Sequence, residues 1–155
     1  MAVEDRILDL GGAVYNVAHS TFNAKGDVRF AEGGTMTAGS PTLTVATNTF
    51  TSSDVGKVIW VPGAEANGRT LSHLDATQDK GAEDYVTISG YVSPTQVTLS
   101  KNAATSVTGQ KIGFGSYDNA AIQAAVDMAA AAGGGRVLCQ GGRTYLVRNV
   151  IMRPG

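Results

Sequence analysis

The sequence predicts a mainly β protein with one alanine-rich α-helix. It contains 155 residues with 20 glycines and only 16% charged residues, a composition typical of short strands joined by tight turns. The middle of the chain alternates in the manner of antiparallel strands. Residues 119–132 contain strong helix formers with no Pro or Gly, and three glycines follow directly. We therefore expect a small antiparallel β-sandwich or barrel, then a helix that caps the first strands of a solenoid.

The first part of the chain, to about Asp27, begins with a short amphipathic segment. Val3, Ile7 and Leu10 are spaced so that they share one face of a helix, which the glycine pair at 11–12 would end. So short a helix needs a partner that buries its apolar face. The partner is either the rest of the same domain or a sister chain at an oligomer axis.

The second part, roughly residues 33–114, contains five strand-like segments rich in Val, Ile, Thr or aromatic residues. These segments are "TLTVATNTF" from Thr42, "KVIWV" from Lys57, "YVTISGYV" from Tyr85, "TQVTLS" from Thr95 and "KIGF" from Lys111. The third and fourth segments predict a hairpin that turns at Ser93–Pro94. Between the first two segments, Ser52 or Ser53 is expected to cap a single helical turn that Gly56 closes.

The third part contains the alanine-rich helix and the strands that come after it. Asp118 is placed to accept hydrogen bonds from the free N–H groups of the first helical turn. One face of the helix carries an apolar stripe, which consists of Ile122, Val126 and Ala129 and is widened by Ala125 and Ala132. Glycines 133–135 end the helix, and the chain continues into "RVLCQ" and then "TYLV". A helix in this place covers the open end of a strand solenoid, which otherwise exposes unpaired backbone groups.

Charge and cysteine content exclude several classes of function. The formal net charge is -1 with no cluster of Lys or Arg, so we expect neither nucleic-acid binding nor insertion into a membrane. Residues 1–12 lack the positive charge and apolar run of a secretory signal. We therefore expect a protein that is made in the cytoplasm and that either matures there or leaves the cell by a route that does not need such a signal. Cys139 is the only cysteine and is expected to be a small buried residue of a strand.

The sequence contains no recognisable catalytic constellation, and we expect no metal ion or other cofactor. Asp75 and Asp79 belong to an acidic cluster in "DATQDKGAED". This cluster is either a sugar or cation site or a solvated loop, and the loop is favoured because the spacing does not match a calcium-binding loop. His19 and His73 lack partners at metal-ligand spacing and are expected at the surface or in turns.

Trp60, in "VIWVPG", is the only tryptophan of the chain. An exposed Trp60 would be a carbohydrate or subunit contact, because aromatic faces stack on sugar rings and anchor interfaces. The flanking Val58, Ile59 and Val61 favour instead a place in the core of the middle domain.

Two segments together resemble the start of the pectate-lyase-like superfamily of right-handed parallel β-helices: "FNAKGD" at 22–27 and "YDNAAIQAAVDMAAAAGGGRVLCQGGRTYLV" at 117–147. That family opens with a strand ending in a Lys-Gly-Asp turn, an aspartate-led alanine-rich helix, a glycine run, and a strand leading to Gly-Thr-Tyr. The resemblance implies structural roles for the matching residues, which are Lys25, Gly26, Asp27, Asp118, Ile122, Val126, Gly133, Gly134, Gly135 and Tyr145.

The chain departs from the family pattern in three ways. Asn23 stands where the family has Gly, and "CQGGRTY" stands where a pair of prolines usually precedes the last turn. The largest departure is that the whole middle part separates the Lys-Gly-Asp turn from the helix. The resemblance therefore implies an N-terminal helix and strand over 1–32, an inserted β domain over 33–114, and a capping helix with the first β-helix rung over 115–155. An insertion of this size is tolerated if its ends lie close together.

Within the insertion, "FTSSDVGKVIWVPGA" is similar to a module of bacteriophage tailspikes and related β-helical proteins. The resemblance implies the N-terminal, particle-proximal neck of a phage or prophage tailspike, located in the virion. Such a protein is a homotrimer that joins a phage tail or baseplate protein to a β-helix that recognises or degrades capsular polysaccharide or lipopolysaccharide.

Two other functions remain open from the sequence. The chain is alternatively part of a polysaccharide-degrading β-helix enzyme, a hydrolase or a lyase, whose inserted domain contacts carbohydrate. A weaker alternative is a free-standing carbohydrate-binding domain. In the tailspike interpretation this region itself has no catalytic residues, and depolymerase activity belongs to the rest of the protein.

Overall fold

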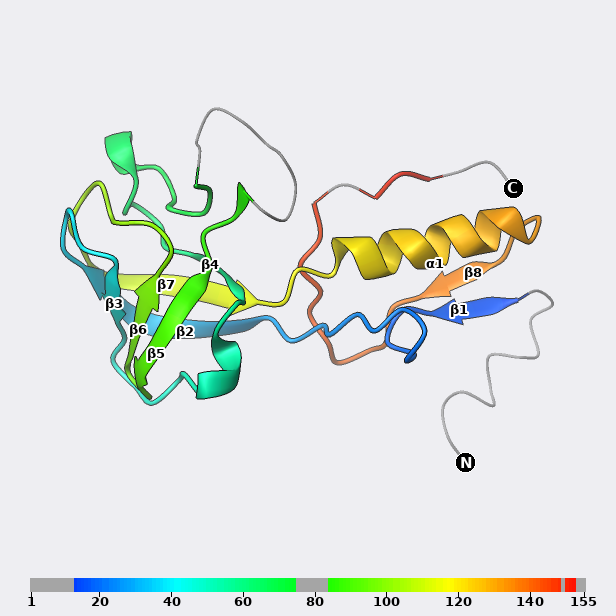
Figure 1. Cartoon of the computed structure of the whole chain (residues 1–155), viewed down its shortest axis with the longest axis horizontal. Helices are drawn as coiled ribbons and strands as arrows, with labels where there is room; N and C mark the ends of the chain where they lie inside the picture. The colour runs from blue at the N-terminus through cyan, green and yellow to red at the C-terminus, as the bar shows by residue number, and fades with distance from the viewer. Residues whose placement is uncertain (1–12, 75–83, 149, 153–155) are drawn as a thin grey trace. The chain divides into compact units, whose positions relative to one another are not determined.

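The computed structural model describes residues 13–74, 84–148 and 150–152. The chain forms two compact units, of which unit 1 consists of residues 1–27 and 117–155 and unit 2 of residues 28–116 (Figure 1). The described protein is mainly β with one α-helix, as the sequence predicts. Each unit has its own cluster of buried apolar side chains.

Unit 2 is a single curled antiparallel sheet of six strands in the order β4-β7-β2-β3-β6-β5. The strands are β2 (Arg29–Met36), β3 (Thr42–Thr44), β4 (Val58–Trp60), β5 (Ile88–Ser93), β6 (Gln96–Leu99) and β7 (Val107–Gly115). The predicted hairpin is confirmed, because β5 and β6 pair across a turn at Pro94–Thr95. Unit 2 also contains two short 3-10 turns, η3 (Ser52–Asp54) and η4 (Ala66–Gly68).

The two ends of the curled sheet are joined by backbone hydrogen bonds. Val58 of β4 bridges Thr87, just before β5. The N–H of Ile59 donates to the carbonyl of Val86 at 2.9 Å, and the N–H of Ile88 donates to Lys57 at 2.9 Å. Of the two architectures left open by the sequence, these bonds select the barrel, which covers the sheet edge that an open sandwich would expose.

Alternation along the strands sends apolar side chains inward in every strand of the barrel. The largest fully buried members of its core are Phe114, Leu43, Ile59, Leu71, Ile88 and Ile112. Trp60 is not a member of this core, and the expectation that it would be is wrong. Because Ile59 points inward, the next residue of β4 points to the outer face, where Trp60 is half-buried.

The predicted helical turn before β4 exists as η3, but its cap differs from the prediction. The N-cap is Thr51 rather than Ser52 or Ser53. Asp54 at the third position of the turn accepts hydrogen bonds from the N–H of Thr51 at 2.8 Å and from its hydroxyl at 3.1 Å. Thr51 and Asp54 form a capping box, and Gly56 with φ of 89° then closes the turn.

The Asp54 carboxylate is fully buried and lies between two cations. Arg29 donates to its Oδ1, and the Lys57 ammonium lies 3.0 Å from the same oxygen. Burial alone would raise the pKa of Asp54, but the hydrogen bonds from Thr51, Arg29 and Lys57 outweigh it and hold the pKa below the usual value. The ionised carboxylate therefore ties η3 to the start of β2 and the start of β4.

Because of this pKa shift, the stability of unit 2 depends on pH in the acidic range. A carboxylate whose pKa is depressed by folding stabilises the folded state above its unfolded pKa of about 3.9 and loses that contribution as pH falls through the lower folded pKa. Unfolding of unit 2 by denaturant is followed by the fluorescence of Trp60. We expect the denaturant concentration at the midpoint to decrease when the pH is lowered below about 4. This decrease in the midpoint with pH should be smaller in Asp54→Asn. An equal decrease in both proteins would contradict a lowered pKa of Asp54 in the folded state.

Unit 1 contains β1 (Val14–Asn16), α1 (Asn119–Ala131) and β8 (Arg136–Leu138). α1 lies over the parallel pair formed by β1 and β8 (Figure 1). The buried core of this unit consists of Val17, Ala24, Ile122 and Ala125, with Tyr15, Phe22, Ala121, Val137, Tyr145 and Val150 packed against it. The predicted helix with Val3, Ile7 and Leu10 lies outside the described residues.

The glycine run ends α1 as expected. Gly133 has a φ of 81°, and the N–H of Gly134 donates to the carbonyl of Ala129 at 2.9 Å. Gly135 then brings the chain against β1, because a Cβ there would lie 2.7 Å from the Tyr15 ring. Two expectations are wrong at this end of the helix. Ala132 is exposed and does not widen the apolar stripe, and Cys139 is exposed because it follows the last residue of β8.

The small size of Ala125 is required for α1 to pack on the strands. Ala125 is completely buried, whereas Ala124 on the same helix is exposed. We expect Ala125→Trp to lower the free energy of unfolding of unit 1 by about 1–3 kcal/mol or more through overpacking. Ala124→Trp is the matched control and should have little effect. An unchanged melting temperature of Ala125→Trp, followed by the circular dichroism of α1, would show that the stripe is not buried.

Candidate functional site

Unit 1 contains two stretches of chain that run side by side in parallel. We call residues 13–27 together with 117–118 the first coil, and residues 136–146 the second coil. β1 at the start of the first coil pairs in parallel with β8 at the start of the second. Among the described strands, β8 pairs only with β1.

The two coils also meet farther along their length. Asp27 pairs with Thr144, and Tyr117 pairs with Leu146, both in parallel. Because these partners are two positions apart in the second coil, Asp27 and Tyr117 lie about two positions apart along the first coil, with room for one residue between them. The chain therefore leaves unit 1 and returns to it at almost the same point. The ends of unit 2 are also neighbours, because β2 and β7 are antiparallel partners.

A single carboxylate joins the segments at this point. Asp118 is only 3% exposed, and it accepts hydrogen bonds from the N–H groups of Lys25 at 2.6 Å, Gly26 at 3.1 Å and Leu146 at 3.4 Å. The N–H of Asp118 donates to the carbonyl of Leu146 at 2.9 Å. The prediction that Asp118 caps α1 through its side chain is wrong, because the carboxylate makes no cap bond. It holds the two coils together instead.

The Lys-Gly-Asp turn lies beside this carboxylate. Gly26 has a φ of 54°, and a Cβ there would lie 2.7 Å from the Tyr145 ring, so only glycine fits. Asn23, which replaces the glycine of the family pattern, also has a positive φ of 60°, a conformation that asparagine tolerates better than most residues. Arg143 donates to the carbonyl of Lys25 at 2.9 Å. The residues of the motif therefore fix the backbone of the turn.

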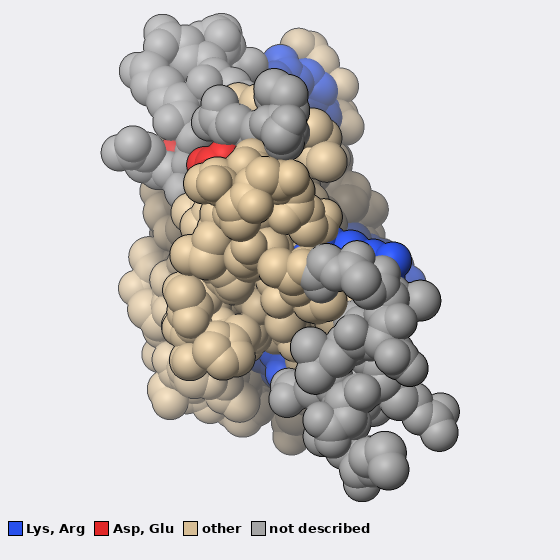
Figure 2. All heavy atoms as spheres, turned by 90° about the vertical axis from the view of Figure 1, so that its right-hand side faces the viewer, with Lys and Arg blue, Asp and Glu red and all other residues tan. Residues whose placement is uncertain are grey.

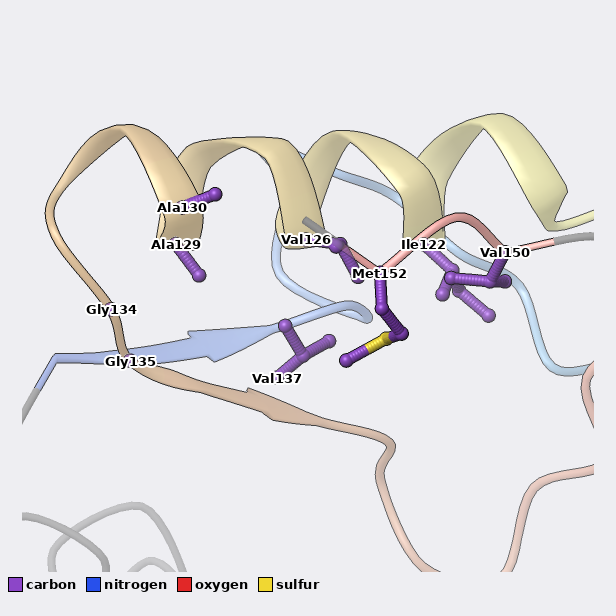
Figure 3. A pocket seen from close by; sticks show the side chains of 9 residues that line it. All are labelled: Ile122, Val126, Ala129, Ala130, Gly134, Gly135, Val137, Val150 and Met152. Atoms are coloured by element: carbon purple, nitrogen blue, oxygen red, sulfur yellow. The ribbon is translucent and has the colours of Figure 1, made fainter. Parts of the chain in front are cut away.

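Beneath α1, unit 1 has an apolar hollow with a volume of about 390 Å³. It is lined by Ile122, Val126, Ala129, Ala130, Gly134, Gly135, Val137, Val150 and Met152 (Figure 3). Figure 3 shows that the hollow lies between α1 and β8, with the side chain of Met152 in front of it. The lining contains no titratable side chain, so the hollow is suited to apolar side chains rather than to a polar substrate.

The described residues of unit 1 also include exposed large apolar side chains. The exposed large apolar side chains of this unit are Met128, Val147, Ile151 and Met152, and Met152 is 79% exposed. Figure 2 shows few Lys, Arg, Asp or Glu side chains among the described residues on the side of the molecule that it presents.

The predicted acidic and histidine positions do not form a site in the described part of the chain. Asp75 and Asp79 lie outside the described residues. Asp84 of the same cluster is buried, at 7% exposure, and is not part of a solvated loop. His19 is exposed in a turn beside Thr21, whereas His73 is half-buried with its ring 4.8 Å from that of Tyr85.

Across the described residues, no group of three or more His, Cys, Asp or Glu side chains is arranged to hold a metal ion. None of the helices in the same residues combines the length and the apolar character needed to cross a membrane. Neither a protein-family model nor a curated protein sequence matches the chain.

Proposed function

We propose that this chain is the N-terminal, particle-proximal neck of a bacteriophage or prophage tailspike. In this role it is a trimerising structural module of the virion. It joins a phage tail or baseplate protein to a β-helix that recognises or degrades capsular polysaccharide or lipopolysaccharide. The observation that supports the proposal most is the parallel pairing of the two coils in the same order along both, which is the pattern of consecutive turns in a parallel β-helix.

In this proposal, unit 2 is a barrel inserted into the first coil. The support is local, because Asp27 and Tyr117 lie about two positions apart along that coil, with room for one residue between them. Because the inserted chain leaves and re-enters the first coil at neighbouring positions, the residues on both sides of the insertion keep their register with the second coil. The predicted limits of the insertion, 33 and 114, fall within β2 and β7, and the division between the units at 28 and 116 places both whole strands in the barrel.

The second coil and the apolar hollow are the surface on which the next coil stacks. A further parallel strand would lie beside β8, and its inward side chains would fill the hollow under α1. α1 lies over β1 and β8 as a cap. This role needs no catalytic residue in the chain itself.

Oligomeric state tests the proposal. A trimerising neck should have three times the chain mass of 15.9 kDa in light scattering at micromolar concentration. A mass of one chain at every concentration would contradict the proposal and would favour a free-standing domain.

The alternative enzyme function has a separate test. The chain is incubated with capsular polysaccharide or lipopolysaccharide, and new reducing ends or unsaturated uronate absorbance are measured. We expect neither product. Either product would assign catalysis to this region.

A further inference from the structure

The outer face of the barrel carries two aromatic side chains on either side of a glycine. Phe30 of β2 is opposite Gly113 of β7, and Gly113 is opposite Trp60 of β4. The three residues therefore form one row across three neighbouring strands. Phe30 is 54% exposed although it lies in a strand of the sheet. This row belongs entirely to unit 2, so any function of the row is independent of the stacking proposed for unit 1.

Gly113 makes the shape of this row possible. A Cβ at this position would lie 2.1 Å from Cζ2 of Trp60, so the indole packs directly against the backbone of β7. The ring of Phe30 stands at 79° to the indole with centroids 6.0 Å apart. The two rings therefore form a corner rather than a flat plate. No described residue accepts a hydrogen bond from the Nε1–H of Trp60.

A charged pair, Lys111 and Glu32, lies beside this row of residues, and we call the row and the pair together the patch. The Lys111 ammonium lies 5.5 Å from the centre of the Phe30 ring and 3.3 Å from the carboxylate of Glu32. Both side chains are more than half exposed. The pair supplies hydrogen-bond donors and acceptors beside the rings, and its two charges cancel. The patch is therefore complementary to an uncharged ligand that has hydroxyl groups and an apolar ring face.

We propose that this aromatic corner binds a pyranose ring of a neutral glycan. The C–H face of the sugar would contact Phe30 and the free part of the Trp60 indole. Sugar hydroxyls would accept from Nε1–H of Trp60 and the Lys111 ammonium and would donate to Glu32.

The size of the patch favours a sugar over a protein partner. Three strands about 4.8 Å apart make a row about 10 Å wide, and with the neighbouring charged row the patch covers on the order of 100 Å². That area suits one or two sugar rings and is far below the roughly 800 Å² that each partner buries in a stable protein interface.

The single tryptophan makes the proposal directly testable, because all tryptophan fluorescence of the chain comes from this site. The full chain is titrated with maltohexaose, cellohexaose and a chitin hexamer. We expect at least one to change the fluorescence saturably, with a Kd of about 1 mM. No saturable change with any of the three probes, up to their solubility, would overturn the proposal.

Variants separate this site from nonspecific effects. Phe30→Ala keeps the fluorophore and should weaken binding about tenfold, whereas Tyr91→Ala, which removes an exposed aromatic ring from β5, should not. The melting temperature of each variant is measured to establish that it is folded. Equal weakening by both substitutions would overturn the proposal. A drop in the solution mass of Phe30→Ala would also overturn it, because the patch would then be a contact between chains.

Discussion

Asp118→Ala is expected to lower the free energy of unfolding of unit 1 by about 3 kcal/mol or more, enough to unfold this small unit. The substitution leaves the N–H groups of Lys25, Gly26 and Leu146, which are partly buried, without their acceptor. Each buried donor without a partner costs about 1–3 kcal/mol. The measurement is denaturant unfolding followed by far-ultraviolet circular dichroism, which reports α1.

Asp127→Ala is the matched control for this prediction. Asp127 lies on the same helix and accepts a hydrogen bond from Gln123 at 2.9 Å, a pair of the kind that contributes about 0.2–0.5 kcal/mol. Trp60 fluorescence in the same samples follows unit 2, which should be unaffected by either change. Equal, small losses for both variants would show that Asp118 does not hold the coils together.

Asp54→Ala should have an effect of similar size, but in the barrel. It removes a buried carboxylate that binds two cations and the N-cap of η3, and removing one partner of a buried ion pair costs about 3–5 kcal/mol. We expect the lower end, about 3 kcal/mol, because Arg29 is 42% exposed and can be solvated by water. Trp60 fluorescence during denaturant unfolding measures the loss.

Ser52→Ala is the control for the barrel. Ser52 is exposed in the same turn, so its removal should leave the midpoint nearly unchanged. The circular dichroism of α1 should be the same in both variants. A loss of stability in Ser52→Ala as large as that in Asp54→Ala would show that the turn itself, and not the buried carboxylate, is responsible.

The sequence predicted the elements that local chemistry determines. The absence of Gly and Pro from 119–132 and the glycine run after it were enough to locate α1 and its end. The hairpin at Pro94 was found in the same way. β2 was not found, because the pair Gly33 and Gly34 interrupts its pattern. In the structure, Gly34 is required there, since a Cβ would lie 2.5 Å from Cγ2 of Ile112.

The remaining errors concern partners that are distant in the sequence. Asp118 has the position of a helix cap, yet its carboxylate binds Lys25 and Gly26, more than ninety residues earlier. The apolar neighbours of Trp60 suggested a core residue, but only strand alternation could have placed it on the outer face. The role of Gly113 depends on a partner strand, and no local pattern reveals it.

The central claim is that the two coils of unit 1 are consecutive turns of one solenoid, with the barrel inserted in the first. Deleting residues 28–115 tests it most directly, because the remaining Ser116 then supplies the single residue that the register requires between Asp27 and Tyr117. Amide hydrogen exchange of the shortened chain is compared with that of the full chain. We predict that the N–H groups of Val17 and Arg136, which join β1 and β8, stay protected. A second variant carries two additional glycines at the junction of the shortened chain. Loss of protection in both the shortened chain and this second variant would contradict the claim.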